Sequence, residues 1–378
     1  MTIVHRALLI FASCLCAAAA ADGTLARKSP PLSPIDLSLQ RRLEETVKTN
    51  GWPGAAAAIV TRDGIYLAAA GRRRIDHPEL VTVQDRFGLG SNTKAFTAAV
   101  IGALVERGRL RWDTTLAEAL PDIAMRAEYR SVTLRELMAH RAGLRPWTSD
   151  EAFARAQGFY TGNLMTTRTA FARAALSDQP IAKPGTVSNY SNVDFVIAAA
   201  VAERATGRNW QDLVTDFVMR PLAMQPRYAG SKVELNQPWA HSMRGGKLVP
   251  VDPRKAEPPV MQGAGGIALS IADYSRFVQA NLRGLEGIDT PLLKASTIRE
   301  MHKPVGDGPY GLGWHRQDFA GAPSSVHAGG NGDFFALTVI QPERDLAVIV
   351  LTNDGADETE SQSAEFLKEL IGLLPKTS

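Results

Sequence analysis

Near its start the chain changes from hydrophobic positions at helical spacing to short apolar runs. Residues 37–49 carry apolar side chains every three or four positions, which predicts an amphipathic helix. Residues 55–60 and 65–70 are mostly apolar, and an Arg-Asp-Gly turn at residues 62–64 separates them, which predicts a β-hairpin. The folded part is therefore expected to begin near Ile35 with a helix followed by two paired strands.

The last part of the chain repeats these patterns in the opposite order. Short apolar runs predict strands at residues 310–314, 334–341 and 346–352, with a tight turn over residues 342–345. Residues 360–374 have the spacing of an amphipathic helix that closes the fold.

The middle of the chain is dominated by helical periodicity. Helices are predicted at residues 93–107, 132–140, 193–206 and 210–218. These patterns favour an α+β fold in which terminal helices flank an antiparallel sheet and an all-helical subdomain is inserted in sequence. The expected single catalytic domain, residues 35–378, divides into a sheet subdomain, about 35–108 and 265–378, and a helical subdomain, about 109–264.

The composition is that of a folded globular protein. Of 378 residues, 45% are hydrophobic and 21% charged, which argues against disordered and fibrous classes. Lysine and arginine number 42 against 39 aspartates and glutamates, a formal net charge of +3, without a long run of like charges. This balance argues against nucleic acid as a partner.

The first 21 residues differ from the rest and are expected to be an export signal. A short basic start, an apolar stretch and a run of alanines have the order typical of a secretory signal peptide. The apolar stretch is shorter than a membrane-spanning helix, so the expected location is periplasmic or secreted without stable membrane insertion. Both cysteines, Cys14 and Cys16, lie in this segment, which excludes thiol chemistry from the mature chain. Residues 22–34, with three prolines, predict a flexible tether.

Ser91 and Lys94 form the first candidate chemical motif. They stand three residues apart in Ser91-Asn92-Thr93-Lys94, which the apolar periodicity places in the first turn of a helix, so they share a face. An amine whose pKa burial lowers can take the serine proton and create a nucleophile. The amide of Ser91, at a helix start, can also stabilise an oxyanion. A helix-capping serine beside a solvated lysine is the alternative interpretation.

Two further constellations lie downstream. In Tyr190-Ser191-Asn192 the phenol can carry a proton and the amide can bind the lysine or a substrate carbonyl. Alternatively, this segment is a surface turn with a capping asparagine. His327 precedes Ala328, Gly329 and Gly330, whose small size lets a substrate backbone lie against a strand edge. A lone histidine is otherwise usually structural.

The three motifs together indicate a serine hydrolase. Each motif occurs once in the chain, and their order is fixed. The Gly-x-Ser-x-Gly elbow, the His-Glu-x-x-His zinc pair and a phosphate-binding loop are absent from the sequence. Neither a metal nor another cofactor is therefore expected.

The sequence resembles the penicillin-recognising serine hydrolases, in the branch of class C β-lactamases, D-alanyl-D-alanine carboxypeptidases, D-amino-acid peptidases and related esterases. Besides the three motifs, the resemblance rests on residues 137–144, Pro184-Gly185, residues 264–267 and residues 310–314. It implies a β-lactamase/transpeptidase-like fold and covers nearly all of residues 35–374.

By this resemblance each motif residue takes a catalytic role. Ser91 is the acylated nucleophile, Lys94 its base and Tyr190 the proton carrier. Asn192 is a substrate and lysine ligand, and His327 and Gly329 are substrate-binding residues. Gly330 supplies the second oxyanion amide beside that of Ser91. The expected partners are small esters, amides or D-peptides.

The motif at His327 departs from that of true β-lactamases, which usually carry lysine there. Histidine is largely neutral at pH 7, so a substrate carboxylate is expected to be held less firmly, and acidification from pH 8 to 6 is expected to protonate the ring. An esterase, amidase or D-peptidase is therefore favoured. A class C-like β-lactamase or DD-carboxypeptidase, and a slowly acylating penicillin-binding receptor, remain the alternatives.

Overall fold

The computed structural model describes residues 33–255, 260–330 and 332–373. The expected export signal, residues 1–21, and most of the expected tether therefore lie outside the described residues. Helix α1 begins at Pro34, because Ser33 caps it and exchanges hydrogen bonds with Asp36.

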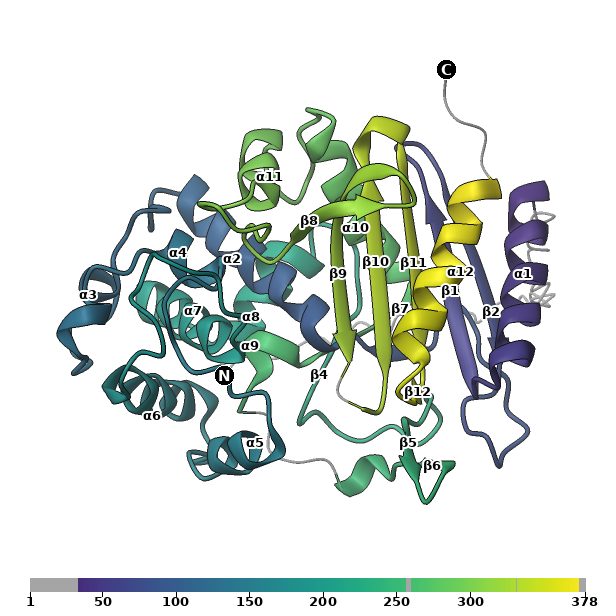
Figure 1. Cartoon of the computed structure of the whole chain (residues 1–378), viewed down its shortest axis with the longest axis horizontal. Helices are drawn as coiled ribbons and strands as arrows, with labels where there is room; N and C mark the ends of the chain where they lie inside the picture. Colours follow the sequence, from purple (N-terminus) through teal and green to yellow (C-terminus); the bar gives the residue numbers. More distant parts are fainter. Residues whose placement is uncertain (1–32, 256–259, 331, 374–378) are drawn as a thin grey trace, which may run out of the picture.

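A six-stranded antiparallel sheet forms one half of the molecule, in the strand order β2-β1-β11-β10-β9-β8 (Figure 1). Strands β1 and β2 form the expected hairpin, and β10 and β11 confirm two of the three C-terminal strands. The strands of this sheet are β1 (Gly54–Val60), β2 (Ile65–Gly71), β8 (His315–Phe319), β9 (Ala322–Gly330), β10 (Phe335–Gln341) and β11 (Leu346–Thr352).

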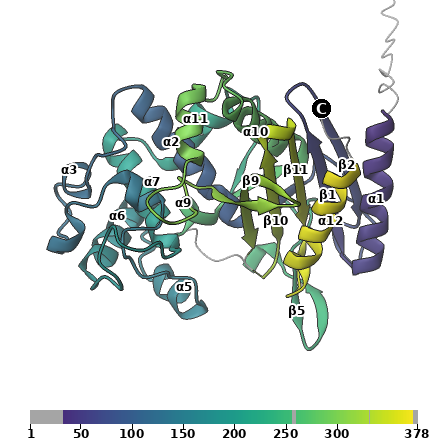
Figure 2. The same ribbon diagram turned by 45° about the horizontal axis from the view of Figure 1, so that its top comes forward.

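Helices cover both faces of this sheet. The terminal helices α1 (Pro34–Asn50) and α12 (Thr359–Leu373) lie side by side on one face (Figure 2), and their leucines pack on alternate residues of β1, β10 and β11. Helix α10 (Ile271–Leu285) covers the other face. The terminal helices confirm the fold class expected from the sequence.

Helix α2 (Thr93–Glu106) joins the sheet to the helical half. Every residue from Thr93 to Leu104 is buried, because α7, α9 and α11 pack against this helix and Phe96 stacks on Phe277 of α10. The remaining helices are α3 (Leu116–Ala119), α4 (Leu134–Met138), α5 (Asp150–Gln157), α6 (Leu164–Ser177), α7 (Asn192–Thr206), α8 (Trp210–Val214), α9 (Gln262–Gly265) and α11 (Ala295–His302).

Two expectations from the sequence are wrong. Residues 310–314 are not a strand, because the amides of Gly311 and Leu312 bond to Trp314 and Met301 rather than to a neighbouring strand; β8 follows them. Residues 109–264 are not entirely helical, because three short strands from this interval, β4 (Arg227–Tyr228), β5 (His241–Arg244) and β6 (Lys247–Pro250), belong to two small sheets. One sheet has the strand order β3 (Arg86–Gly88), β7 (Ile267–Ser270), β4. The other has the order β12 (Asp354–Gly355), β5, β6.

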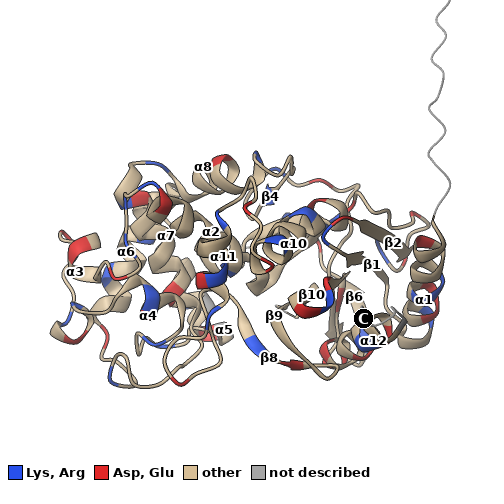
Figure 3. Ribbon diagram, turned by 90° about the horizontal axis from the view of Figure 1, so that it is seen from above, with Lys and Arg blue, Asp and Glu red and all other residues tan. Residues whose placement is uncertain are grey.

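Charged side chains are interspersed over both halves of the molecule. Figure 3 shows lysines and arginines alternating with aspartates and glutamates on the helical half and on the terminal helices. None of the helices among the described residues has the length and apolar character needed to cross a membrane.

Candidate active site

Ser91 lies where the sheet meets the helical half. It occupies a short 3₁₀ turn, Gly90–Asn92, that leads directly into α2. The end of β9 touches this turn so closely that a Cβ on Gly329 would lie 2.2 Å from the carbonyl oxygen of Leu89 and 2.6 Å from the amide nitrogen of Ser91. Glycine has no Cβ, so the backbone of β9 can lie directly against the turn that carries Ser91.

Lys94 is completely buried one helical turn after Ser91. Its Nζ lies 2.9 Å from Ser91 Oγ, 2.8 Å from Asn192 Oδ1 and 3.0 Å from the carbonyl oxygen of Ala264. Burial lowers the pKa of Lys94 to about 7, because the charged form loses its hydration. A neutral amine donates to the two oxygen acceptors and keeps its lone pair for the hydroxyl proton of Ser91.

Tyr190 approaches Ser91 from the opposite side. Its hydroxyl donates to Ser91 Oγ across 2.5 Å, and its ring lies 4.7 Å from Lys94 Nζ. Burial of the phenol raises the pKa of Tyr190 to about 12, although 40% of the residue's surface stays exposed. Tyr190 is therefore a proton donor at neutral pH.

Asn192 connects the lysine to the helical half. It begins α7, and its Nδ2 donates to the carbonyl oxygen of Trp147 at 3.2 Å while its Oδ1 accepts from Lys94. The expected contact with the lysine is thus present, and a contact with substrate stays a prediction.

His327 lies on β9, 4% exposed, and both of its ring nitrogens have partners within the protein. The carbonyl oxygen of Ala328 can only accept, so Nδ1 carries the proton and donates to it at 2.8 Å, whereas Nε2 accepts from the hydroxyl of Tyr310 at 2.7 Å. Burial lowers the pKa of His327 to about 3. The ring therefore stays neutral at pH 6, contrary to the expectation from the ordinary histidine pKa.

Gly330 ends β9 beside the nucleophile. A Cβ on Gly90 would lie 2.9 Å from the amide nitrogen of Gly330, so this nitrogen and that of Ser91 both lie beside the contact between the turn and the strand. This proximity supports the pairing of the two amides expected for an oxyanion site.

Three further residues behind Tyr190 were not predicted as site residues. Tyr310 binds His327, and buried His140 pairs with buried Asp194 through Nδ1 and Oδ2 at 2.6 Å. His140 and Tyr310 belong to the segments 137–144 and 310–314 that carried the resemblance, which was the available signal. Asp194 had no comparable signal.

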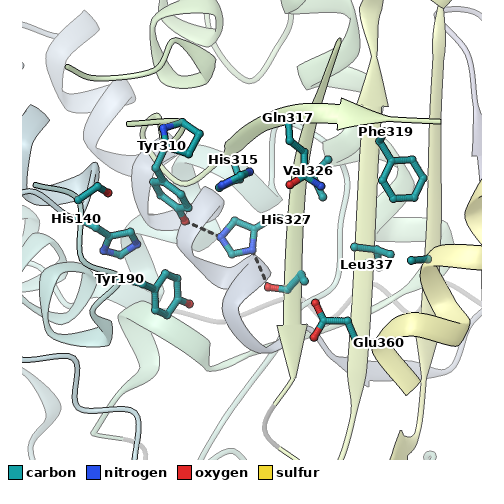
Figure 4. Close-up of a pocket in the computed structure, with 14 residues that line it drawn as sticks. His140, Tyr190, Tyr310, His315, Gln317, Phe319, Val326, His327, Leu337 and Glu360 are labelled. Carbon is teal, nitrogen blue, oxygen red and sulfur yellow. Dashed lines mark hydrogen bonds between the residues drawn. The ribbon is translucent and has the colours of Figure 1, made fainter. Parts of the chain in front are cut away.

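A pocket of about 460 Å³ opens beside Tyr190 and His327 (Figure 4). Its apolar wall reaches α12 and comprises Phe319, Val326, Leu337 and Ala364. Its polar lining includes His140, Tyr310, His315 and Glu360. Among the described residues, no group of three or more histidine, cysteine, aspartate or glutamate side chains is arranged to hold a metal ion. The chemistry that this arrangement offers is nucleophilic attack by a serine with an adjacent amine base.

Comparison with known proteins shows the family to which the chain belongs. The family model described as Beta-lactamase matches residues 39–372. Unguisins hydrolase ungD' of Aspergillus campestris is 27% identical over 341 residues, which cover 85% of this chain but only 62% of that protein. Penicillin-binding protein 4 of Amycolatopsis lactamdurans is 26% identical, with 89% of each chain covered. The crystal structure of a D-stereospecific amidohydrolase from Streptomyces superposes with a TM-score of 0.69 at 25% identity and covers 87% of this chain and 97% of that one.

Proposed function

The chain belongs to the beta-lactamase family of serine hydrolases, and from this premise we propose that it hydrolyses small esters, amides or D-peptides through an acyl-enzyme on Ser91. The observation that carries the proposal is the position of Ser91 Oγ, 2.9 Å from the amine of Lys94 and 2.5 Å from the hydroxyl of Tyr190. One neighbour can take the serine proton and the other can supply a proton to a leaving group.

Acylation follows from these two contacts. Neutral Lys94 takes the proton of Ser91 as Oγ bonds to the carbonyl carbon of the substrate, and the amides of Ser91 and Gly330 bind the oxyanion. When the tetrahedral intermediate collapses, the leaving group departs with the proton of Tyr190. The proton held on Lys94 restores the phenol, so that the net transfer is from Ser91 to the leaving group.

Deacylation uses the same groups with water as the nucleophile. Neutral Lys94 takes a proton from water as the water oxygen attacks the acyl carbon, and Tyr190 donates its proton to Ser91 Oγ as the ester bond breaks. The proton held on Lys94 then restores the phenol, so that the net transfer is from water to Ser91. The product is a free carboxylic acid.

Among the residues that the structure describes, the pocket offers no cation to a substrate carboxylate, so substrates without a carboxylate are favoured over β-lactams. His327 replaces a cation with a neutral ring, and a relative named D-stereospecific amidohydrolase supports amides with D-configuration as substrates. A class C-like β-lactamase or DD-carboxypeptidase, and a penicillin-binding receptor that acylates slowly, are the alternatives that the relative named penicillin-binding protein 4 supports.

The test combines covalent labelling with turnover. Wild type should be labelled once by a fluorophosphonate and should turn over a chromogenic short-chain ester continuously. Ser91→Ala should not be labelled, and its turnover rate should fall at least ~10³-fold while its circular dichroism spectrum stays unchanged. A stoichiometric burst that stops would identify the receptor instead. Undiminished turnover in Ser91→Ala would refute the nucleophile, and rapid nitrocefin hydrolysis would favour the β-lactamase.

We also propose export to the periplasm or the medium. The support is the basic, apolar and alanine-rich order of residues 1–21. Fractionation of cells that express the full chain, with N-terminal sequencing of the exported form, tests this. Retention of uncleaved protein in the cytoplasm would refute it.

A further inference from the structure

Within the described part of the chain, the pocket that Tyr190 and His327 line contains one acidic side chain and no basic partner for it. Burial lowers the pKa of His140, His315 and His327, so the three histidines that line it are neutral at pH 7. Glu360 is the acidic residue of the lining, and the lining contains no lysine or arginine among the residues that the structure describes. A substrate group in this pocket therefore meets a negative charge without a compensating cation.

Glu360 is also free of an ion pair. It is exposed in the first turn of α12, and within the described part of the chain no lysine, arginine or histidine nitrogen lies within 4.0 Å of its carboxylate. Figure 4 shows Glu360 below Leu337, with its carboxylate directed toward β9, and both residues line the pocket together with His327. An acid in a first helical turn stabilises the helix, but that role does not require a position in the pocket wall. Glu365, on the same helix, is instead paired with Lys368 at 2.6 Å.

We infer that Glu360 selects the charge of the substrate: a group that carries an amine is favoured beside β9 and a carboxylate is rejected. The inference rests on the proposed function, because it concerns the same acyl-transfer site. Glu360 is exposed, so water screens its charge nearly as in bulk solvent, where Coulomb attraction at about 4 Å corresponds to a roughly three- to tenfold preference; salt weakens it further.

The experiment uses matched esters of one chain length that end in an ammonium, a methyl or a carboxylate group. One series carries the end group on the acyl side and a second series carries it on the alcohol side. In at least one of the two series, the kcat/KM of wild type should be highest for the ammonium ester, intermediate for the methyl ester and lowest for the carboxylate ester. Glu360→Gln should reduce the ammonium-to-carboxylate ratio roughly three- to tenfold, and Glu360→Lys should invert it. Glu365→Gln is the matched control and should leave the ratio unchanged.

The outcomes separate the two proposals. An unchanged ratio in Glu360→Gln and Glu360→Lys in both series overturns the inference, even if Ser91-dependent turnover of the methyl ester is normal. Turnover of the methyl ester that survives Ser91→Ala overturns the proposed function instead. Added salt should compress the wild-type ratio and leave methyl-ester turnover constant.

A second inference concerns the buried pair of His140 and Asp194. Each is 1% exposed, and the His140 ring lies 4.6 Å from the rings of both Tyr190 and Tyr310. His140 also binds the loop that carries the tyrosine: its carbonyl oxygen accepts from the amide of Asn189 at 2.7 Å, and its Nδ1 lies 3.2 Å from the amide of Ser191. His140 thus binds the residues on both sides of Tyr190, Asn189 through its backbone and Ser191 through its side chain.

The protonation of this pair follows from its contacts. The amide of Ser191 can only donate, so Nδ1 of His140 is an acceptor, and Asp194 must then present a protonated oxygen to it at 2.6 Å. Burial raises the pKa of Asp194 and lowers the pKa of His140, in agreement with a neutral pair.

We propose that His140 and Asp194 are positioning residues that hold Tyr190 against Ser91, with Asp194 acting as a neutral hydrogen-bond donor. Asp194→Asn keeps a donor and should retain kcat within about threefold, whereas Asp194→Leu, similar in size but without a donor, should lower kcat roughly ten- to a hundredfold with little change in KM. The rate of fluorophosphonate labelling should fall in parallel.

Glu203→Gln serves as the control for destabilisation alone. Glu203 lies on the same helix α7 and is paired with buried Arg168, away from Ser91. This variant should lower the melting temperature and keep kcat per labelled site. Equal losses in Asp194→Asn and Asp194→Leu would overturn the proposal, as would normal kcat in Asp194→Leu. If Asp194→Leu does not fold, the comparison is made with Asp194→Ala.

Discussion

Lys94 can take the proton of Ser91 only while its own amine is uncharged. Because burial lowers the pKa of Lys94 to about 7, we expect kcat/KM for a neutral ester to rise with pH through about 7 and then level off. A profile with an uncharged ester between about pH 5.5 and 9 measures this, because neither the substrate nor His327, whose pKa is about 3, titrates in that interval. A flat profile would show that another group is the base.

Lys94 and Tyr190 share one oxygen of Ser91, so their contributions should not be independent. The double variant Lys94→Ala/Tyr190→Phe should be little slower than the slower single variant, because a proton-transfer unit loses most of its effect with the first deletion. Steady-state kcat with active-site titration measures this, and circular dichroism checks the fold. Losses that multiply in the double variant would contradict the shared role.

Ser91 and Lys94 were predictable as a pair because their spacing is local. A hydroxyl and an amine three positions apart at a helix start already define one face, and the structure shows the expected hydrogen bond. The charge of His327 was not predictable, because its low pKa comes from burial that only the packed strand creates. The contact between His140 and Asp194 joins positions 54 residues apart, and no local pattern encodes it.

At the scale of elements, the contact between the end of β9 and the turn before α2 determines the width of the site. Gly329→Ala should lower kcat/KM roughly a hundredfold, because its Cβ would lie 2.2 Å from the backbone oxygen of Leu89 and must push strand and turn apart. Gly372→Ala, on α12 with nothing within 4 Å of the added carbon, is the matched control. Unchanged turnover in Gly329→Ala would show that the contact tolerates displacement.

Elements were predictable where local hydrophobic pattern and backbone pairing agree. Strands β1, β2, β10 and β11 are continuous apolar runs that pair with sequence neighbours or each other, so their pattern alone indicated them. Residues 310–314 have a similar composition, but the amide of Leu312 bonds to α11 and that of Gly311 bonds within the segment. These contacts override the local preference for a strand. The short strands β4, β5 and β6 are too brief to show a period.

At the scale of the whole molecule, α2 and α10 join the sheet and the helical half in one hydrophobic cluster, and α11 closes it near Trp314. His302, at the end of α11, lies in this junction with 2% exposure. Its Nε2 donates to Asn281 Oδ1 at 3.0 Å, and its ring stacks on Trp314 at 4.5 Å. Burial holds the pKa of His302 well below its ordinary value.

This histidine should make the junction sensitive to acid. The unfolded chain protonates His302 near its ordinary pKa of ~6.5 whereas the folded protein does not, so the free energy of unfolding should fall by up to about 1.4 kcal/mol per pH unit below that value and be unaffected above it. His302→Gln keeps a donor for Asn281 and cannot titrate. Denaturant unfolding between about pH 7.5 and 5 should therefore show a shallower loss of stability in His302→Gln than in wild type. Identical slopes for wild type and His302→Gln would mean that this ring is protonated equally in both states.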